Sequence, residues 1–274
     1  MIDIHTHILY GLDDGSESLE ESIEMCQVAY RDGVRILVAT PHTLNGVYRN
    51  DRSAILTRVH EFNQALAQCG IRSAEFGMED SSSVQFEIRN SQSAISFKVL
   101  PGADVSFSPD ILIRFERGEV ETLNDQGRHI LLEFPSQGIP YRAEEVLFQL
   151  MAKGIVPIIS HPERNLEIAR KPERYYEMIR KGCLGQVTAM SLTGGFGSGV
   201  RRVAEKLLAN RLVHMIASDA HSVGGRPPIL STAVRAAGKI VGAEEARKMV
   251  TEYPEAVLNG RRLRVSDPIP IDKW

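Results

Sequence analysis

The chain has 274 residues, with 32 Lys and Arg against 35 Asp and Glu, which gives a formal net charge of -3. This balance argues against a surface for nucleic acid or for an anionic membrane, because both depend on a sustained basic face. The apolar fraction of 43% is that of an ordinary globular protein. The length allows one large domain or two smaller ones.

The first residues, MIDIHTHILYGLDD, place Asp3 and His5 where a secretory signal would need apolar residues. No later stretch reaches the roughly 18 apolar residues of a membrane-spanning helix. Cys26, Cys69 and Cys183 are odd in number and far apart, which supports neither a disulfide framework nor a zinc ribbon. We therefore expect a cytoplasmic protein without a membrane span.

Short β-rich runs alternate with amphipathic stretches along the chain. The expected strands are 2–4, 35–40, 98–104, 129–134, 155–160, 184–189 and 213–219. Helices are expected after Ser18, over 55–69, from 108 onward, and at 141–153, 172–181, 198–210 and 228–241. This alternation predicts an α/β fold, with a parallel sheet or barrel and outer helices.

The first two helices have the clearest patterns. Ser18 and Glu21 fit a capping box in which each side chain accepts from the other's amide, and Gly33 suits the position after the last turn. In the second helix an apolar stripe ends at Cys69 before Gly70, so Cys69 is expected to be a core thiol.

One stretch interrupts the alternation. Residues 75–97 are polar and rich in serine, with an alternating run at 84–88 before a turn-prone run at 90–93. We interpret this stretch as a β-hairpin inserted in a loop, either a flap over a site or a solvated insertion without a catalytic role. No linker or repeat divides the chain, so a single domain over residues 1–274 is expected.

Histidines and carboxylates fall at the ends of the expected strands. His5 and His7 stand two apart in extended chain, where side chains point to the same side and can converge on one metal. The other strands, except the one at 184–189, end in residues of the same kind, namely His42, Asp104, Glu133, His161, Asp219 and His221. In a β/α barrel the catalytic groups lie at the C-terminal ends of the strands, so these residues would meet at one mouth.

The alternative for each histidine is a buried structural residue. We adopt it for His60, His129 and His214, which lie on a helix or at the starts of strands. For the set at the strand ends, unpaired carboxylates in apolar strands would cost on the order of several kcal/mol each, and a divalent metal removes that cost. Mixed histidine and carboxylate ligands suit zinc, manganese or iron rather than calcium.

Three loop features have more than one interpretation. Asp13 and Asp14 suit a helix cap or an Asx turn. Arg164 and Arg226 follow candidate ligands by a few residues and suit either the two oxygens of a phosphate or surface salt bridges. The run GGFGSG at 194–199 suits a flexible barrel loop bordering a cleft better than a phosphate cradle.

Two other phosphate chemistries lack their residues. A cysteine-dependent tyrosine phosphatase needs an arginine six positions after its cysteine, and none of the three cysteines has one there. The chain also contains no GxxxxGK[ST] phosphate loop.

The ordered motifs resemble a known family. The pairs His5-x-His7 and Asp219-x-His221, with the single candidates between them, are similar to the polymerase and histidinol phosphatase (PHP) superfamily. The phrases MIDIH, DDG, YR, HPER, ASDAH and GRPP are similar to the bacterial manganese-dependent tyrosine-protein phosphatases of the CpsB/YwqE type. The resemblance runs from residue 1 to about 260.

This resemblance implies a distorted seven-stranded, TIM-like β/α barrel that holds three divalent metals, with manganese favoured and iron, zinc or magnesium as alternatives. The implied ligands are His5, His7 and Asp219 for the first metal, Glu133 and His161 for the second, Asp104 bridging those two, and Asp14, His42 and His221 for the third. The family's bridging residue is normally Glu, so Asp104 departs from the pattern by one methylene.

The implied reaction is hydrolysis of phosphotyrosine on the tail of a bacterial tyrosine kinase that controls capsular polysaccharide or exopolysaccharide synthesis. A metal-activated hydroxide would attack the phosphorus, Arg164 and Arg226 would bind the phosphoryl group, and His42 or Asp14 would assist. One alternative is histidinol-phosphatase or another small-molecule phosphoesterase of the same superfamily. Another is a metal-binding regulatory module without turnover.

Overall fold

The computed structural model describes residues 1–68 and 97–271. The hairpin expected at 75–97 lies outside the described residues except for its last position, and so does Cys69. Their predicted structures stay predictions, as does the single-domain boundary.

The strands form two parallel sheets, in the order β1-β2-β4 and β3-β5-β6-β7-β8-β9. Their bounds are β1 Ile2–Thr6, β2 Ile36–Ala39, β3 His42–Thr43, β4 Lys98–Pro101, β5 Asp104–Ser106, β6 His129–Glu133, β7 Val156–Ser160, β8 Leu184–Thr188 and β9 Met215–Ala217. The expected strand 35–40 is β2, which a further short strand, β3, follows, and the expected strand 98–104 is divided between β4 and β5. Pro41 separates β2 from β3, because it lacks the amide hydrogen that a continuous ladder needs.

Backbone hydrogen bonds join the last strand to the first. The Asp219 amide donates to the His5 carbonyl at 2.9 Å, and the His7 amide donates to the Ala220 carbonyl at 2.8 Å. Thr6 and Ala220 also form a parallel bridge. With the strand orders given above, these contacts place the strands around a common axis, which is the distorted β/α barrel that the family resemblance implies.

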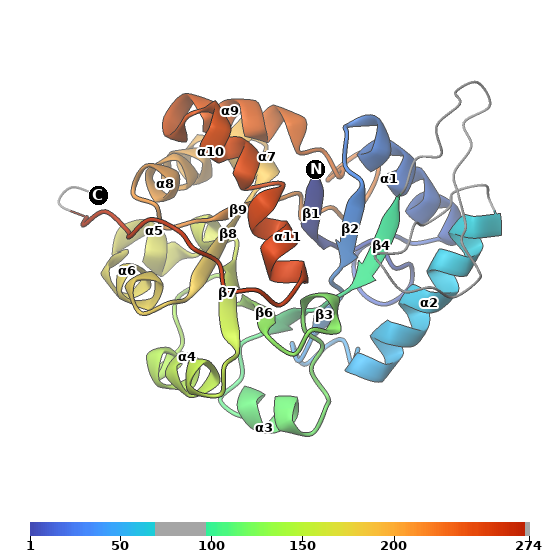
Figure 1. Ribbon diagram of the computed structural model, residues 1–274, viewed down its shortest axis with the longest axis horizontal. Helices are drawn as coiled ribbons and strands as arrows, with labels where there is room; N and C mark the ends of the chain where they lie inside the picture. Colours follow the sequence, from blue (N-terminus) through green and yellow to red (C-terminus); the bar gives the residue numbers. More distant parts are fainter. Residues whose placement is uncertain (69–96, 272–274) are drawn as a thin grey trace.

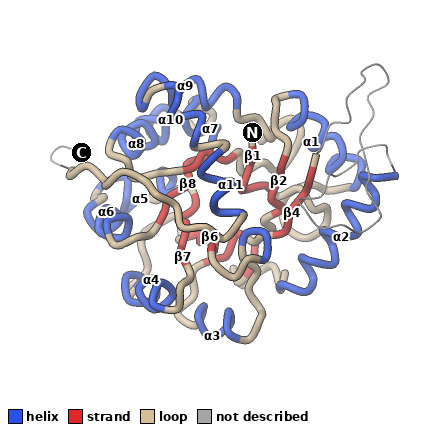
Figure 2. Tube along the Cα trace, in the orientation of Figure 1, coloured by secondary structure: helices blue, strands red, loops and turns tan. Residues whose placement is uncertain are grey.

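Helices cover the outside of the barrel, and in Figure 2 the strands gather in the middle with helices around them. The longer helices are α1 Leu19–Arg31, α2 Arg52–Gln68, α4 Ala143–Ala152, α6 Glu173–Arg180, α8 Ser198–Ala209 and α9 Ser231–Val241. The shorter ones are α3 Ile111–Glu116, α5 Leu166–Arg170, α7 Ala189–Thr193, α10 Ala243–Lys248 and α11 Glu252–Leu258, with 3-10 turns η1 Leu123–Asp125 and η2 Pro162–Arg164. All the longer helices were predicted.

Two predicted helix starts differ in detail. The Ser18 hydroxyl accepts from the Glu21 amide at 3.1 Å, but the Glu21 carboxylate accepts from the Glu17 amide and not from Ser18. Only half of the predicted capping box is therefore present. The helix expected from residue 108 begins at Ile111, with Asp110 at its N-cap, and the Ser108 hydroxyl bonds the Asp110 carboxylate.

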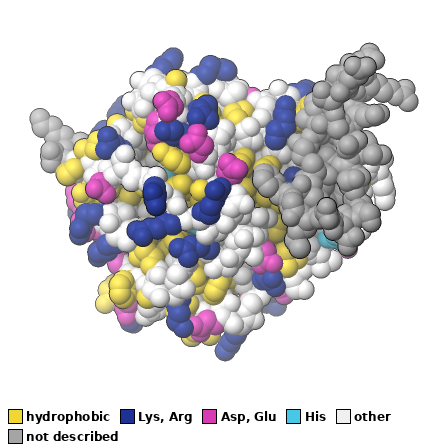
Figure 3. All heavy atoms as spheres, in the orientation of Figure 1, with side chains coloured by type: hydrophobic (Ala, Val, Ile, Leu, Met, Phe, Trp, Pro, Cys, Tyr) yellow, Lys and Arg dark blue, Asp and Glu magenta, His cyan; other side chains and the backbone are white. Residues whose placement is uncertain are grey.

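The barrel interior is a separate apolar cluster. It contains inward-facing residues from the strands, and Val257 and Leu258 of α11 belong to the same cluster. Figure 1 shows α11 lying across the strands. Histidine is nearly absent from this face in the space-filling view of Figure 3, whereas Lys and Arg side chains are frequent there. Across the described part of the chain, none of the helices has the length and apolarity needed to span a membrane.

Candidate metal centre

Nine side chains predicted as ligands lie together at the C-terminal end of the barrel. They form four overlapping groups in which one nitrogen or oxygen of each residue lies within 4.8 Å of the others. The groups are His5, His7 and Asp219; His5, Asp104 and His161; His42, Asp104 and Glu133; and His7, Asp14, His42 and His221. The convergence of strand ends in a parallel barrel explains how positions more than 200 residues apart come together.

His5 and His7 point their Nε2 atoms toward each other, 3.2 Å apart. His5 Nδ1 donates to the Gln186 side-chain oxygen at 3.0 Å, and His7 Nδ1 donates to Asp13 Oδ2 at 2.6 Å. Because Nδ1 of each ring donates to these acceptors, Nε2 is the atom that would bind a metal, with loss of its proton where the ring is charged. Both rings lie 3.4 Å from Asp219 Oδ1, so this trio has the donor atoms of a metal site.

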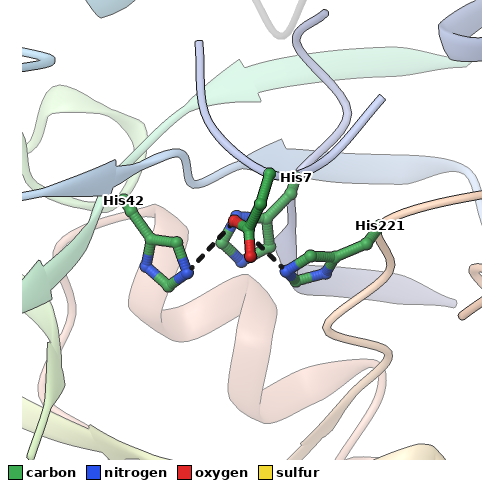
Figure 4. A group of neighbouring side chains, drawn as sticks. His7, His42 and His221 are labelled. Atoms are coloured by element: carbon green, nitrogen blue, oxygen red, sulfur yellow. Dashed lines mark ion pairs between the residues drawn. The ribbon is translucent and has the colours of Figure 1, made fainter. Parts of the chain in front are cut away.

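Asp14, His42 and His221 meet beside His7. Figure 4 shows the imidazoles of His7, His42 and His221 directed toward one another. Its dashed lines mark ion pairs from His42 and His221 to a carboxylate that lies between them. Asp14 Oδ1 lies 3.5 Å from His42 Nε2 and 3.8 Å from His221 Nε2. The Nδ1 of His221 donates to the Asp219 carbonyl at 2.9 Å, which again leaves Nε2 free.

Asp104 stands at the middle of the centre and is fully buried. Its Oδ2 lies 3.6 Å from His5 Nε2 and 3.3 Å from His42 Nδ1, yet no hydrogen bond from the described residues reaches that oxygen. Glu133 Oε1 lies 3.5 Å from His161 Nε2. A buried carboxylate oxygen without a donor, surrounded by imidazoles, fits a bound cation.

The pKa values show how strongly these charges are coupled. Burial lowers the pKa of His7, but its hydrogen bonds with Asp13 and Asp219 outweigh burial and raise the pKa to about 10. Burial and the neighbouring Asp104 carboxylate raise the pKa of Glu133 to about 7. Burial and the His7 charge lower the pKa of His221 to about 3. Such opposed shifts are typical of functional sites rather than of ordinary surfaces.

The backbone is strained at two of the candidate ligands. His161 has φ 34° and Asp219 has φ 54°, the left-handed region that non-glycine residues rarely adopt. The loop that carries Asp13 and Asp14 also passes very close to the backbone just after β1. A side chain at Gly15 has no room there, since its Cβ would lie 2.1 Å from the His7 carbonyl oxygen. These constraints fix the directions of the ligand side chains.

The two arginines predicted to bind phosphate turn toward the candidate ligands, and both pair with the buried carboxylate of Asp219. Arg164 Nη2 donates to Asp219 Oδ2 at 2.6 Å, and Arg226 Nη2 contacts the same oxygen. Both line a cavity of about 230 Å³, together with six of the candidate ligands. The cavity therefore combines carboxylates and imidazoles with two guanidinium groups.

Three residues contribute to this site without having been predicted. Asp13 bonds His7 and also accepts from the His42 amide at 2.9 Å. Gln186 comes from β8, the one strand for which no ligand was expected. The Phe196 ring faces both arginines, in a loop of four residues between α7 and α8.

The three histidines set aside from the sequence lie away from this centre. His60 is exposed on α2 and contacts Gln64. His129 begins β6 and His214 directly precedes β9, so both are buried at the strand ends away from the candidate ligands. Cys26 and Cys183 are buried free thiols.

Comparisons with known proteins agree with this geometry. Residues 1–79 and 74–259 match the family described as "Capsular polysaccharide synthesis, CpsB/CapC". The chain is 34% identical to the tyrosine-protein phosphatase YwqE of Bacillus subtilis, covering 100% of this chain and 97% of that protein. It is 29% identical to the tyrosine-protein phosphatase CpsB of Streptococcus pneumoniae, covering 94% and 98%.

A solved structure is also similar over the full length. It belongs to the crystal structures of YwqE from Bacillus subtilis and CpsB from Streptococcus pneumoniae, described as unique metal-dependent tyrosine phosphatases. The TM-score is 0.87 and the identity 33%, with 100% of both chains covered.

Proposed function

The chain belongs to the CpsB/CapC family of capsular polysaccharide synthesis, and from that premise we propose that it is a metal-dependent phosphotyrosine-protein phosphatase. The observation that carries this proposal is the convergence of nine histidine and carboxylate side chains with two arginines around one cavity. The similarity over the full chain to YwqE and CpsB supports the same activity.

We assign the metal ligands as three sets. His5, His7 and Asp219 form the first set and Glu133 with His161 the second, and Asp104 bridges these two. Asp14, His42 and His221 form the third set, which lies against His7. The place of Asp104 in two of the four close groups supports its bridging role. Manganese is our first choice of metal, and iron, zinc and magnesium are alternatives.

Divalent metals bound by these ligands would polarise the phosphoryl oxygens and lower the pKa of a coordinated water toward neutrality. The chain's own residues supply the rest. Arg164 and Arg226 present guanidinium groups to the cavity, where they bind phosphoryl oxygens and offset their growing negative charge. Their shared contact with Asp219 holds both groups beside the candidate ligands.

The leaving group needs less help than in many phosphate esters. A tyrosine phenol has a pKa of about 10, so it departs more readily than an alkoxide. His42 and Asp14 line the cavity, with His42 Nε2 3.5 Å from Asp14 Oδ1, and would assist the departing oxygen through a bound water. The Asp14 side chain is 55% exposed, so it can reach a substrate at the cavity mouth.

We propose that the substrate is a phosphotyrosine-bearing tail of a bacterial tyrosine kinase. This kinase would control capsular polysaccharide or exopolysaccharide synthesis, and the phosphatase would act in the cytoplasm. The family description and the names of the relatives support this context. The rival substrates are histidinol phosphate and other small phosphomonoesters, which the same cavity chemistry would accept.

The test compares substrates directly. Purified protein with manganese, and the same protein with a chelator, receives a phosphotyrosine peptide and histidinol phosphate in parallel. We expect hydrolysis of the peptide with manganese and none with the chelator. Hydrolysis of histidinol phosphate alone would favour the small-molecule phosphatase, and hydrolysis of neither would favour a metal-binding module without turnover.

A further inference from the structure

The ring of Phe196 faces two cationic groups at once. The Arg164 Cζ atom lies 5.3 Å from the ring centroid, and the Arg226 Cζ atom lies 5.7 Å from it. Both distances fall within the range of about 6 Å at which a guanidinium is attracted to an aromatic face. Arg164 ends η2 after β7, whereas Arg226 lies in the loop after β9, so one side chain contacts cations from two separate loops.

Few other hydrogen bonds from residues 1–68 and 97–271 hold these guanidinium groups. Both bond the same oxygen, Asp219 Oδ2, which brings two positive charges together. The Nε atoms of both arginines are buried and receive no hydrogen-bond partner from the described residues. Asp219 is also a candidate metal ligand, and a carboxylate that shares its charge with a metal attracts an arginine less. The attraction between a guanidinium group and a neutral aromatic face is not weakened by a metal in that way.

The loop that carries Phe196 is short and tightly turned. Gly194 and Gly197 have φ 89° and 91°, a conformation that favours glycine. The Gly195 amide donates to the Met190 carbonyl at 2.8 Å, and the Gly197 amide donates to the Gly194 carbonyl at 2.9 Å. These bonds tie the loop to the end of α7, so the ring has a fixed support.

We propose that Phe196 is a positioning residue, which holds Arg164 and Arg226 in the paired geometry that binds a phosphoryl group. This inference rests on the proposed phosphatase function. Of the described residues, those lining the cavity include both arginines and not Phe196. We expect the ring to act through the arginines and not to contact the phosphoryl group itself.

The experiment compares three substitutions. Phe196→Leu removes the aromatic face, Phe196→Tyr retains it, and Phe148→Leu makes the same change on α4, where the side chain is 66% exposed. The measurements are kcat and KM on a phosphotyrosine peptide, binding of inorganic phosphate by calorimetry, manganese content and Tm. We expect Phe196→Leu to lower kcat/KM about tenfold and to weaken phosphate binding by a similar factor. Its manganese content and Tm should equal those of Phe148→Leu, and Phe196→Tyr should restore both losses.

Three results would overturn the inference. The first is identical behaviour of Phe196→Leu and Phe148→Leu. The second is weaker peptide binding with unchanged phosphate binding, because the ring would then contact the phenol. The third is a loss of manganese or Tm in Phe196→Leu, because the ring would then support the fold. If the wild-type protein hydrolyses no phosphotyrosine, the proposed function fails, and phosphate binding by the same variants still tests Phe196 separately.

Discussion

Asp13 is the residue that most directly controls the state of a candidate ligand. Its Oδ2 accepts the Nδ1 proton of His7 at 2.6 Å, and its Oδ1 accepts from the Gly15 amide at 3.0 Å. It therefore makes the Asx turn that the sequence allowed and orients an imidazole as well. Carboxylates in this position fix the ring and increase its basicity toward the metal.

Replacing Asp13 by Asn should weaken metal binding by about 10- to 100-fold, because the amide removes the charge opposite His7. Manganese affinity measured by titration calorimetry checks this. Asp267→Asn, a change at an exposed position in the C-terminal segment, is the matched control and should leave the affinity unchanged. Equal affinities in the two variants would show that Asp13 has no part in holding His7.

The arginine pair gives a second prediction at this scale. Arg164→Ala or Arg226→Ala should each lower kcat on a phosphotyrosine peptide by about 100-fold or more, with manganese content retained. Arg201→Ala removes an exposed arginine that pairs with Glu205 on α8 and should remain near wild type. Turnover close to wild type in both cavity variants would contradict their phosphate role.

At the scale of elements, α11 belongs to the same apolar cluster as the barrel interior. Leu258 is 4% exposed there, beside residues from several strands. Leu258→Ala should lower the free energy of unfolding by about 2–4 kcal/mol, since a large buried side chain leaves a cavity. Urea denaturation checks this, with Ile113→Ala, at a position 53% exposed on α3, as the control. A similar small change in both variants would contradict the role given to α11.

The strands and longer helices could be predicted because their patterns are local. Period-two and period-3.6 patterns follow from burial on one face, and the convergence of strand ends follows from a parallel barrel. The short helices α5, α7, α10 and α11 have five to seven residues and too few turns for such a pattern.

The candidate ligands at the strand ends could be anticipated from the parallel barrel, and Asp14 only from the family resemblance. The residues that contact these candidates could not be anticipated. Gln186 carries no charge, and its role depends on the fold, which brings its side-chain oxygen within 3.0 Å of His5 Nδ1. Asp13 and Asp14 stand side by side, and only the fold of the loop determines which one faces His7. The glycine-rich run at 194–199 was interpreted as a barrel loop bordering a cleft, but nothing in its pattern singled out Phe196 as a neighbour of both arginines.

At the scale of the whole molecule, folding stability should depend on pH through a buried histidine far from the metal centre. Burial and the nearby Arg128 charge lower the pKa of His129 to about 4. The folded state therefore favours the neutral ring. The stability it contributes is complete above the ordinary pKa of about 6.5 and is lost as the pH falls toward 4.

Lowering the pH from about 7.5 to about 5 should reduce the free energy of unfolding of both proteins. For His129→Leu this reduction should be smaller than for wild type by about 1–2 kcal/mol. Urea unfolding at the two pH values measures the difference. His60→Leu, at an exposed histidine on α2, is the control and should follow wild type. Parallel pH profiles for wild type and His129→Leu would contradict this account.

The net charge of -3 conceals a local concentration of charge at one end of the barrel. The proposed centre gathers four carboxylates, and Arg164 and Arg226 lie directly against it. Bound divalent metals would make this cavity positive within a mildly acidic protein. A doubly charged phosphoryl group is the kind of ligand that such a cavity attracts.

We expect phosphotyrosine hydrolysis to depend on metal bound at the candidate metal centre, and one titration tests this dependence most directly. Protein stripped with a chelator is titrated with manganese while bound metal and hydrolysis of a phosphotyrosine peptide are measured in the same samples. The account predicts no hydrolysis without metal and a rise in rate that follows filling of the sites. Full hydrolysis by the stripped protein, or filled sites without hydrolysis, would contradict it.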